Sequence, residues 1–310
     1  MDARRDLSIT AIGDGERRVD VLVVPGIFES IQLAKAVAAR LEADRAADAN
    51  SDAARLLATF QVEIRCVVPP GYERDRNVRA FAGAADWPDV LPTNSEYLRR
   101  IRDAEARAPA DALRVVFHHS WGGGVAAPLW GDTTRRRPHL AILSAPAWSD
   151  LVTFSARAGG RLLALPGAGI IAERLVPLSL RELSRTGIPT IVDLARGLPV
   201  GFSSREVAYR SYIEVCRLPA LRSPAPPPAV PRAGERVVLA QGTRDRAVRG
   251  RQALARYDEL CAQDADWRGI ELVRGKFEHW PFLETSQLLA TTLLRELARL
   301  DRAARGAGSA

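Results

Sequence analysis

The sequence predicts an α/β fold in which a mostly parallel central sheet is flanked by helices. Short apolar stretches recur along the chain, which is typical of strands that are buried on both faces. Most neighbouring stretches are separated by segments with helical spacing of apolar residues, and this alternation favours parallel strands. The 310 residues can form one large domain with an inserted subdomain, or two small domains.

The strands and helices follow from apolar periodicity and from the residues that bound each segment. Gly13, Asp14 and Gly15 supply a turn between the first two strands, and Thr93 or Asn94 can cap a helix. The expected strands are residues 7–12, 19–24, 60–68, 113–117, 139–143, 236–240 and 270–273. The expected helices are residues 31–47, 93–106, 120–130, 250–261 and 285–302.

The alternation stops between Trp148 and about Val230, where helical segments rich in Leu, Ala, Ile and Arg are broken by Gly and Pro. This change predicts an inserted helical lid, or cap. Its last part, 223–231, is rich in proline and would form a semi-rigid connector back to the sheet. The expected units are a core at 1–147 and 231–303, a lid at 148–230 and a disordered tail at 304–310.

Charge and composition argue against a nucleic-acid partner. The net charge is +7, but the arginines are spread along the predicted helices, usually beside Asp or Glu. The tightest run is Arg135, Arg136 and Arg137, which we interpret as a solvated loop. Heavy use of Ala and Arg with a single Met suggests a GC-rich bacterial genome.

The cysteines and the amino terminus predict a cytoplasmic protein. Cys66, Cys216 and Cys261 are widely spaced and form no pattern that could hold zinc, which fits a reducing compartment. The first residues lack the apolar stretch of a signal peptide, and no run of 18 apolar residues occurs. Neither a metal site nor a membrane span is therefore expected.

The strongest local motif is the passage from an apolar strand through His118, His119, Ser120, Trp121 and Gly122 into a helix of small residues. A serine on a sharp strand-to-helix turn projects above the sheet, while small neighbours allow the strand and the helix to approach closely. Backbone N–H groups at the start of that helix can stabilise an oxyanion. Ser120 is therefore the candidate nucleophile.

A serine nucleophile needs a base, and the base needs an acid that orients it. Asp245 follows a predicted strand and Gly242, and His279 follows the last predicted strand, beside Trp280. Because the carboxyl ends of parallel strands meet at one edge of a sheet, the three side chains are expected to converge. Asp150 is the competing acid, because it follows the preceding strand.

This combination resembles the α/β-hydrolase superfamily over most of the chain. The order Ser120, Asp245, His279 is that of the superfamily, and the serine turn resembles its Gly-x-Ser-x-Gly elbow with His118 in the first small position. The resemblance implies a Ser-His-Asp triad without a metal or an organic cofactor. His118 and His119 are expected to be structural residues near the site, although His118 could reshape the pocket or contribute to catalysis.

The resemblance also implies an oxyanion hole. One donor would be the backbone N–H of Trp121, and the second would come from the loop at Pro25 and Gly26, with Ile27 as the first candidate and Phe28 as the next. The same residues would also serve as an ordinary strand-to-helix turn.

Three functions remain open from the sequence. The first is hydrolysis of a carboxylic ester or thioester with a medium-to-large apolar substrate, which the apolar residues of the lid would cover. The second is a lyase or acyltransferase of bacterial natural-product biosynthesis on the same fold. The third is a non-catalytic binding protein.

Overall fold

The computed structural model describes most of the predicted core. The described residues are 6–27, 29, 31–73, 78, 90–130, 132, 134–152, 205–220, 235–277, 279 and 282–307. They contain a seven-stranded sheet in the order β1-β3-β2-β4-β5-β6-β7. Strand β1 pairs antiparallel with β3, and all other neighbours pair in parallel, so the predicted mostly parallel sheet is confirmed.

Each predicted strand is present, with both ends within two residues of the expected ones. The strands are β1 (Asp6–Ile12), β2 (Arg17–Val24), β3 (Phe60–Val67), β4 (Leu113–His119), β5 (Leu140–Ser144), β6 (Arg236–Gly242) and β7 (Glu271–Gly275). The central strands are almost wholly buried, which explains their apolar sequences.

The helices match the prediction except at a few places. They are α1 (Ile31–Ala47), α2 (Asp52–Thr59), α4 (Asn94–Ala106), α5 (Ser120–Ala126) with the 3-10 turn η1 (Ala127–Trp130), α9 (Arg205–Cys216), α10 (Gly250–Gln263), α11 (Ala265–Arg268) and α12 (Phe282–Ala307). The short helices α2 and α11 were not predicted. Helix α12 includes residues 304–307, which were expected to be disordered, whereas 308–310 lie outside the described residues.

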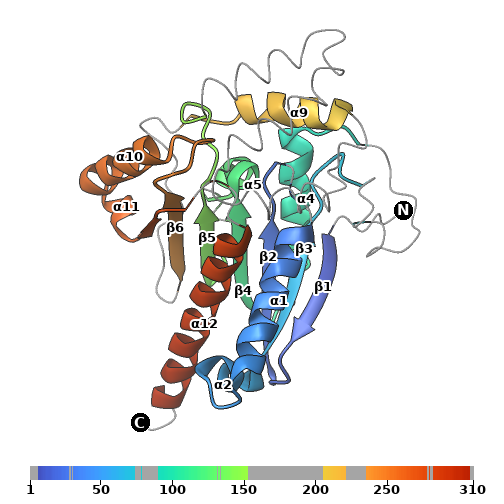
Figure 1. Cartoon of the computed structure of the whole chain (residues 1–310), viewed down its shortest axis with the longest axis vertical. Coiled ribbons are helices and arrows are strands. Elements are labelled where there is room, and N and C mark those ends of the chain that lie inside the picture. The colour runs from blue at the N-terminus through green and yellow to red at the C-terminus, as the bar shows by residue number, and fades with distance from the viewer. Residues whose placement is uncertain are drawn as a thin grey trace.

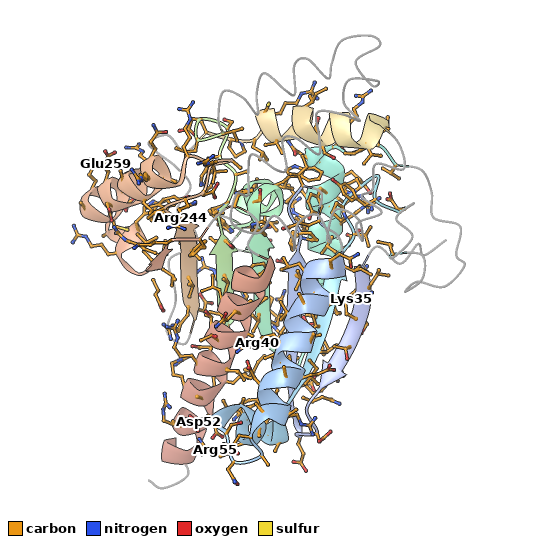
Figure 2. The ribbon with its side chains drawn as sticks, viewed as in Figure 1. Lys35, Arg40, Asp52, Arg55, Arg244 and Glu259 are labelled. Carbon is orange, nitrogen blue, oxygen red and sulfur yellow. The ribbon has the colours of Figure 1, made fainter. Side chains whose placement is uncertain are left out.

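Helices cover both faces of the sheet. Helices α1 and α12 pack side by side over one face, and α4, α5 and α10 lie against strands of the other (Figure 1). Charged side chains such as Arg40, Asp52, Arg55 and Glu259 point outward from their helices (Figure 2). Among the described residues, no helix combines the length and apolar character needed to cross a bilayer.

Strand β2 carries one buried charge within its apolar sequence. The carboxylate of Asp20 accepts two hydrogen bonds from the guanidinium of Arg65 on β3, at 2.6 and 2.8 Å. A bidentate pair satisfies both charges, so an acidic residue is tolerated in the middle of a parallel sheet. Arg65 also donates to the carbonyl of Ala104 and thereby ties α4 to the sheet.

The arginine run before β5 lies in a loop, as predicted, with Arg136 exposed and Arg135 and Arg137 partly exposed. The run also anchors this loop, which was not predicted. Arg135 pairs with the buried Glu105 of α4, and Arg137 lies 3.4 Å from Glu235. Arg136 donates to backbone carbonyls of residues 109, 110 and 112. These contacts hold the loop against α4 and against the segments that precede β4 and β6.

Most of the predicted lid lies outside the described residues. The missing parts are 153–204 and 221–234, so the lid and its proline-rich connector stay predictions. The described helix α9 crosses above the carboxyl ends of the strands (Figure 1). Its Glu214 accepts a hydrogen bond from the backbone N–H of Asn94 at 2.8 Å, so α9 rests on the start of α4.

Candidate active site

Ser120 lies at the junction of β4 and α5, in a backbone conformation that few residues adopt. Its φ is +47°, in the left-handed region, and only 3% of the residue is exposed. Such strain is typical of functional sites and persists only where the surroundings fix it. The turn is also tight, because a Cβ on Gly122 would lie 2.5 Å from the carbonyl oxygen of Pro25.

His279 and Asp245 complete a hydrogen-bonded chain from the serine. The Oγ of Ser120 lies 2.8 Å from Nε2 of His279, and Nδ1 of His279 lies 2.9 Å from Oδ2 of Asp245. A carboxylate only accepts hydrogen bonds, so Nδ1 carries the proton and the lone pair of Nε2 faces the serine hydroxyl. All three residues are buried.

Four donors fix the carboxylate of Asp245. Backbone N–H groups of Ala247 and Val248 donate to Oδ1 at 2.9 and 3.0 Å, and Gln241 donates to Oδ2 at 3.0 Å, beside His279. Burial alone would raise the pKa of Asp245, but His279 and these hydrogen bonds hold the pKa below 3.8. Gln241 was not predicted; its one sequence signal is its position at the end of β6.

The loop after β2 lies against the serine turn. A Cβ on Gly26 would lie 2.9 Å from Cβ of Ser120, so only glycine fits there without displacement. Ile27, the first predicted oxyanion donor of this loop, is buried, whereas Phe28 lies outside the described residues. The N–H of Gly26 is already occupied by Glu29, and the N–H of Trp121 lies in the first turn of α5, where helices leave donors free.

Two side chains of α4 hold this arrangement from the side. The indole of Trp121 donates to Oδ1 of Asn94 at 2.9 Å and packs against the ring of Tyr97, with centroids 4.8 Å apart. The hydroxyl of Tyr97 donates to the carbonyl oxygen of Pro25 at 2.6 Å. Neither residue was identified from the sequence as part of the site: Asn94 was considered only as a helix cap, and Tyr97 belongs to no recognisable motif.

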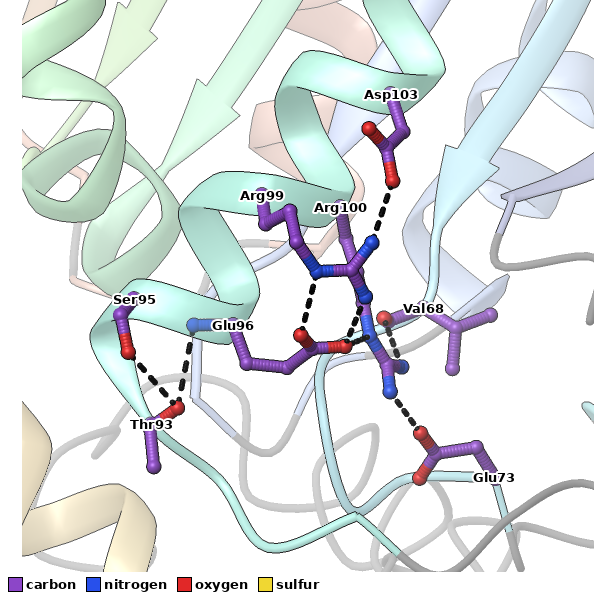
Figure 3. A network of polar contacts seen from close by, with 8 residues as sticks. All are labelled: Val68, Glu73, Thr93, Ser95, Glu96, Arg99, Arg100 and Asp103. Atoms are coloured by element: carbon purple, nitrogen blue, oxygen red, sulfur yellow. Dashed lines mark hydrogen bonds and ion pairs between the residues drawn. The ribbon is translucent and has the colours of Figure 1, made fainter.

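Helix α4 is itself fixed by a network of ion pairs (Figure 3). Thr93 caps the helix by accepting the N–H of Glu96 at 3.2 Å. The buried Arg100 pairs with Glu96 and Glu73 and donates to the carbonyl of Val68 at 3.0 Å. The network joins α4 to the end of β3, and a rigid α4 keeps Asn94 and Tyr97 in position.

His119 forms a second histidine–carboxylate pair beside that of His279 and Asp245. Its Nδ1 lies 2.8 Å from Oε2 of Glu29, and its Nε2 lies 3.0 Å from the backbone carbonyl oxygen of His279. Burial opposes the charged ring, but Glu29 and the carbonyl of His279 raise the pKa of His119 above 6.5. Glu29 was missed in the sequence because it lies 90 residues from His119 and belongs to no motif.

His118, the residue that replaces the usual glycine, has no such partners. Both ring nitrogens are buried without a hydrogen-bond partner among the described residues. Burial, assisted by Arg135, lowers the pKa of His118 to about 3, so the ring is neutral. It lines a cavity of about 30 Å³ with Leu129, Trp130 and Arg135.

The remaining predicted residues differ in their placement. The carboxylate next to Nδ1 of His279 is that of Asp245; Asp150 lies in the turn after β5 and is partly exposed. Trp280 lies outside the described residues. Within the described ranges, no group of His, Cys, Asp and Glu side chains could hold a metal ion.

Comparisons with known proteins find similarity in structure alone, and not in sequence. No family model matches the chain, and no curated protein matches its sequence. An esterase from Exiguobacterium antarcticum aligns with a TM-score of 0.60 and 15% identity, over 93% of this chain and 94% of that chain.

Two further solved structures are similar over nearly the whole chain. A 1H-3-hydroxy-4-oxoquinoline 2,4-dioxygenase aligns with a TM-score of 0.56 and 15% identity, over 93% of this chain and 95% of that chain. An alpha/beta hydrolase fold protein from Burkholderia ambifaria aligns with a TM-score of 0.55 and 17% identity, over 92% of each chain. These likenesses confirm the predicted fold.

Proposed function

We propose that this chain, which has the α/β-hydrolase fold, is a serine hydrolase that cleaves a carboxylic ester or a thioester. The observation that carries the proposal is the continuous hydrogen-bonded chain from Oγ of Ser120 through the ring of His279 to Asp245. Similar structures that are esterases support the proposal.

Each side chain has one role in the proposed reaction. Ser120 attacks the carbonyl carbon while Nε2 of His279 accepts its proton, and Asp245 stabilises the imidazolium that forms. The negative oxygen of the tetrahedral intermediate accepts hydrogen bonds from the N–H groups of Trp121 and Ile27. His279 then protonates the leaving group, and the same base activates water to release the acyl group.

The substrate that we propose is medium to large and apolar. The support is the content of Leu, Ala, Ile and Pro in residues 148–230, the segment that the sequence predicts to be a lid. The buried triad is consistent with a reaction that proceeds under a cover.

The same fold is compatible with a second class of reaction. One of the similar structures is a dioxygenase, so the fold alone does not decide between hydrolysis and other chemistry. A lyase would use His279 as a base and would leave Ser120 unacylated, whereas an acyltransferase would pass the acyl group to an acceptor other than water. A binding protein would do neither.

Release of p-nitrophenol from p-nitrophenyl esters of increasing acyl length tests hydrolysis directly. We expect turnover by the native chain, and a loss on the order of a millionfold in Ser120→Ala. Ser8→Ala is the matched control, because Ser8 is an exposed serine on β1. Equal turnover by Ser120→Ala and Ser8→Ala, or none by the native chain with any ester, would reject the proposal.

A further inference from the structure

The two ring nitrogens of His119 both face oxygen atoms. Nδ1 lies 2.8 Å from Oε2 of Glu29, and Nε2 lies 3.0 Å from the carbonyl oxygen of His279. A backbone carbonyl only accepts, so Nε2 must carry a proton. Oε2 of Glu29 already accepts a hydrogen bond from the N–H of Gly26, which favours an ionised carboxylate that accepts a second hydrogen bond, from Nδ1–H.

Both side chains of the pair are buried, and few charged groups lie near them among the described residues. Exposed fractions are 1% for His119 and 2% for Glu29. Among the described residues, the titratable groups that act on His119 are Glu29 in the loop after β2, which we call the oxyanion loop, His279 after β7 and Asp245 after β6. Two of these three are carboxylates, so the surroundings favour a cation at His119.

The pair also connects the parts of the proposed active site that differ most in sequence position. Glu29 holds the N–H of Gly26 in the loop after β2, whereas His119 directly precedes the nucleophile and holds the backbone of the base. A Cβ on Gly26 would lie 3.0 Å from Oε2 of Glu29 and 3.1 Å from Nδ1 of His119. The oxyanion loop, the elbow and the loop of His279 are therefore joined through one ion pair.

We propose that His119 is a positioning residue, which remains an imidazolium cation and fixes the loop of His279 through its Nε2–H. The inference rests on the proposed function in that His279 is taken as the general base. The cation has a second effect. It neutralises Glu29, whose uncompensated negative charge beside Ser120 would oppose the oxyanion of the transition state.

The protonation state can be measured without any turnover. The chain has four histidines, so the ring ¹⁵N signals of the whole protein can be assigned by comparison with the spectrum of His119→Gln. We expect both ring nitrogens of His119 to remain protonated above pH 6.5, because Glu29 raises the pKa of the ring. A neutral ring of His119 at pH 6.5 would overturn the inference, whether or not the chain hydrolyses esters.

Two substitutions separate the contact to His279 from the contact to Glu29. The amide nitrogen of glutamine corresponds in position to Nε2 of histidine, and that of asparagine corresponds to Nδ1. We therefore expect His119→Gln to keep the bond to the carbonyl of His279 and His119→Asn to lose it. A displaced base costs about 100-fold in rate, so kcat should fall on the order of 100-fold in His119→Asn and about tenfold in His119→Gln, with little change in KM.

The pH profile is the readout that a packing role would not change. In the native chain kcat should decline at alkaline pH as Nδ1 of His119 loses its proton, because the charge of Glu29 is then no longer neutralised. This decline should be absent in His119→Gln. His139→Gln is the control, because His139 lies before β5 and bonds the backbone of Arg114. Equal kcat values for His119→Asn and His119→Gln would overturn the positioning role, and an unchanged alkaline decline in His119→Gln would overturn the neutralisation of Glu29 by the cation.

Discussion

Two buried histidine–carboxylate pairs lie side by side in this protein, and they differ in what the second ring nitrogen meets. In the pair of His279 and Asp245 that nitrogen meets the hydroxyl of Ser120, whereas in the pair of His119 and Glu29 it meets a backbone carbonyl. The nitrogen–oxygen distances to the carboxylates are 2.9 and 2.8 Å. The carboxylates alone therefore do not distinguish the two pairs.

The second partner decides the chemistry of each ring. A hydroxyl can both donate and accept, so His279 can take a proton from Ser120 and return it. A carbonyl oxygen has no proton to give, so His119 can only hold its own. The comparison teaches that a buried histidine beside a carboxylate is a base only if its other nitrogen faces a group with an exchangeable proton.

Among changes to the two pairs, removal of the negative charge from Asp245 should have the largest effect. Asp245→Asn leaves His279 in the wrong tautomer, and kcat should fall on the order of ten thousandfold, as in serine proteases with this change. Glu29→Gln should cost far less, because His119 does not transfer the proton of Ser120. The test is to measure kcat of both variants with the same p-nitrophenyl ester. Similar losses of kcat in the two variants would contradict the different roles of the two pairs.

A methyl group on Gly26 should affect both pairs at once. The added Cβ would meet Cβ of Ser120 and the contact between Glu29 and His119, so the oxyanion loop must move away from the serine. Loss of one oxyanion donor typically lowers kcat about 100-fold or more, and we expect a loss of that order in Gly26→Ala. A normal kcat with an intact melting transition would show that the loop does not position an oxyanion donor.

The two pairs should also stabilise the fold in different pH ranges. The pKa of His119 is raised, so its contribution is fully present below pH 6.5 and is lost as the pH rises through the higher pKa of the folded state. The pKa of Asp245 is lowered, so its contribution is present above pH 3.8 and is lost as the pH falls through the lower folded value. Urea unfolding of His119→Gln should show a smaller loss of stability on the alkaline side than the native chain, and parallel curves would contradict this.

The smallest effect is expected at His118. Its ring is neutral and makes no hydrogen bond to any residue that the structure describes, so His118→Phe should leave kcat unchanged. Two buried polar atoms without partners would be removed, each of which typically costs about 1–3 kcal/mol, so the unfolding free energy should rise. A large loss of turnover in a stable His118→Phe protein would assign this ring a catalytic role.

Most of the fold could be predicted because its signals are local. Apolar strands alternate with helical segments, and the boundaries carry Gly, Pro and capping residues such as Thr93. The order of Ser120, Asp245 and His279 at strand ends predicted that they would meet, because parallel strands share one carboxyl edge. Helix α2 was missed because its eight residues are too short for a clear period.

The supporting residues of the site could not be predicted, for a physical reason. The contact of Glu29 with His119 and that of Tyr97 with Pro25 depend on the paths of two loops and on the position of α4. Such contacts join residues 90 and 72 positions apart and have no fixed spacing. The anchoring contacts of the run from Arg135 to Arg137 could not be predicted for the same reason, because their acceptors lie on distant segments.

The most direct test of the account is the reaction of the native chain with a fluorophosphonate, followed by peptide mass spectrometry. The account predicts a single adduct on Ser120, formed far more slowly in His279→Gln and at the native rate in Ser8→Ala. An adduct on another residue, or labelling of Ser120 at the same rate without the imidazole of His279, would contradict it.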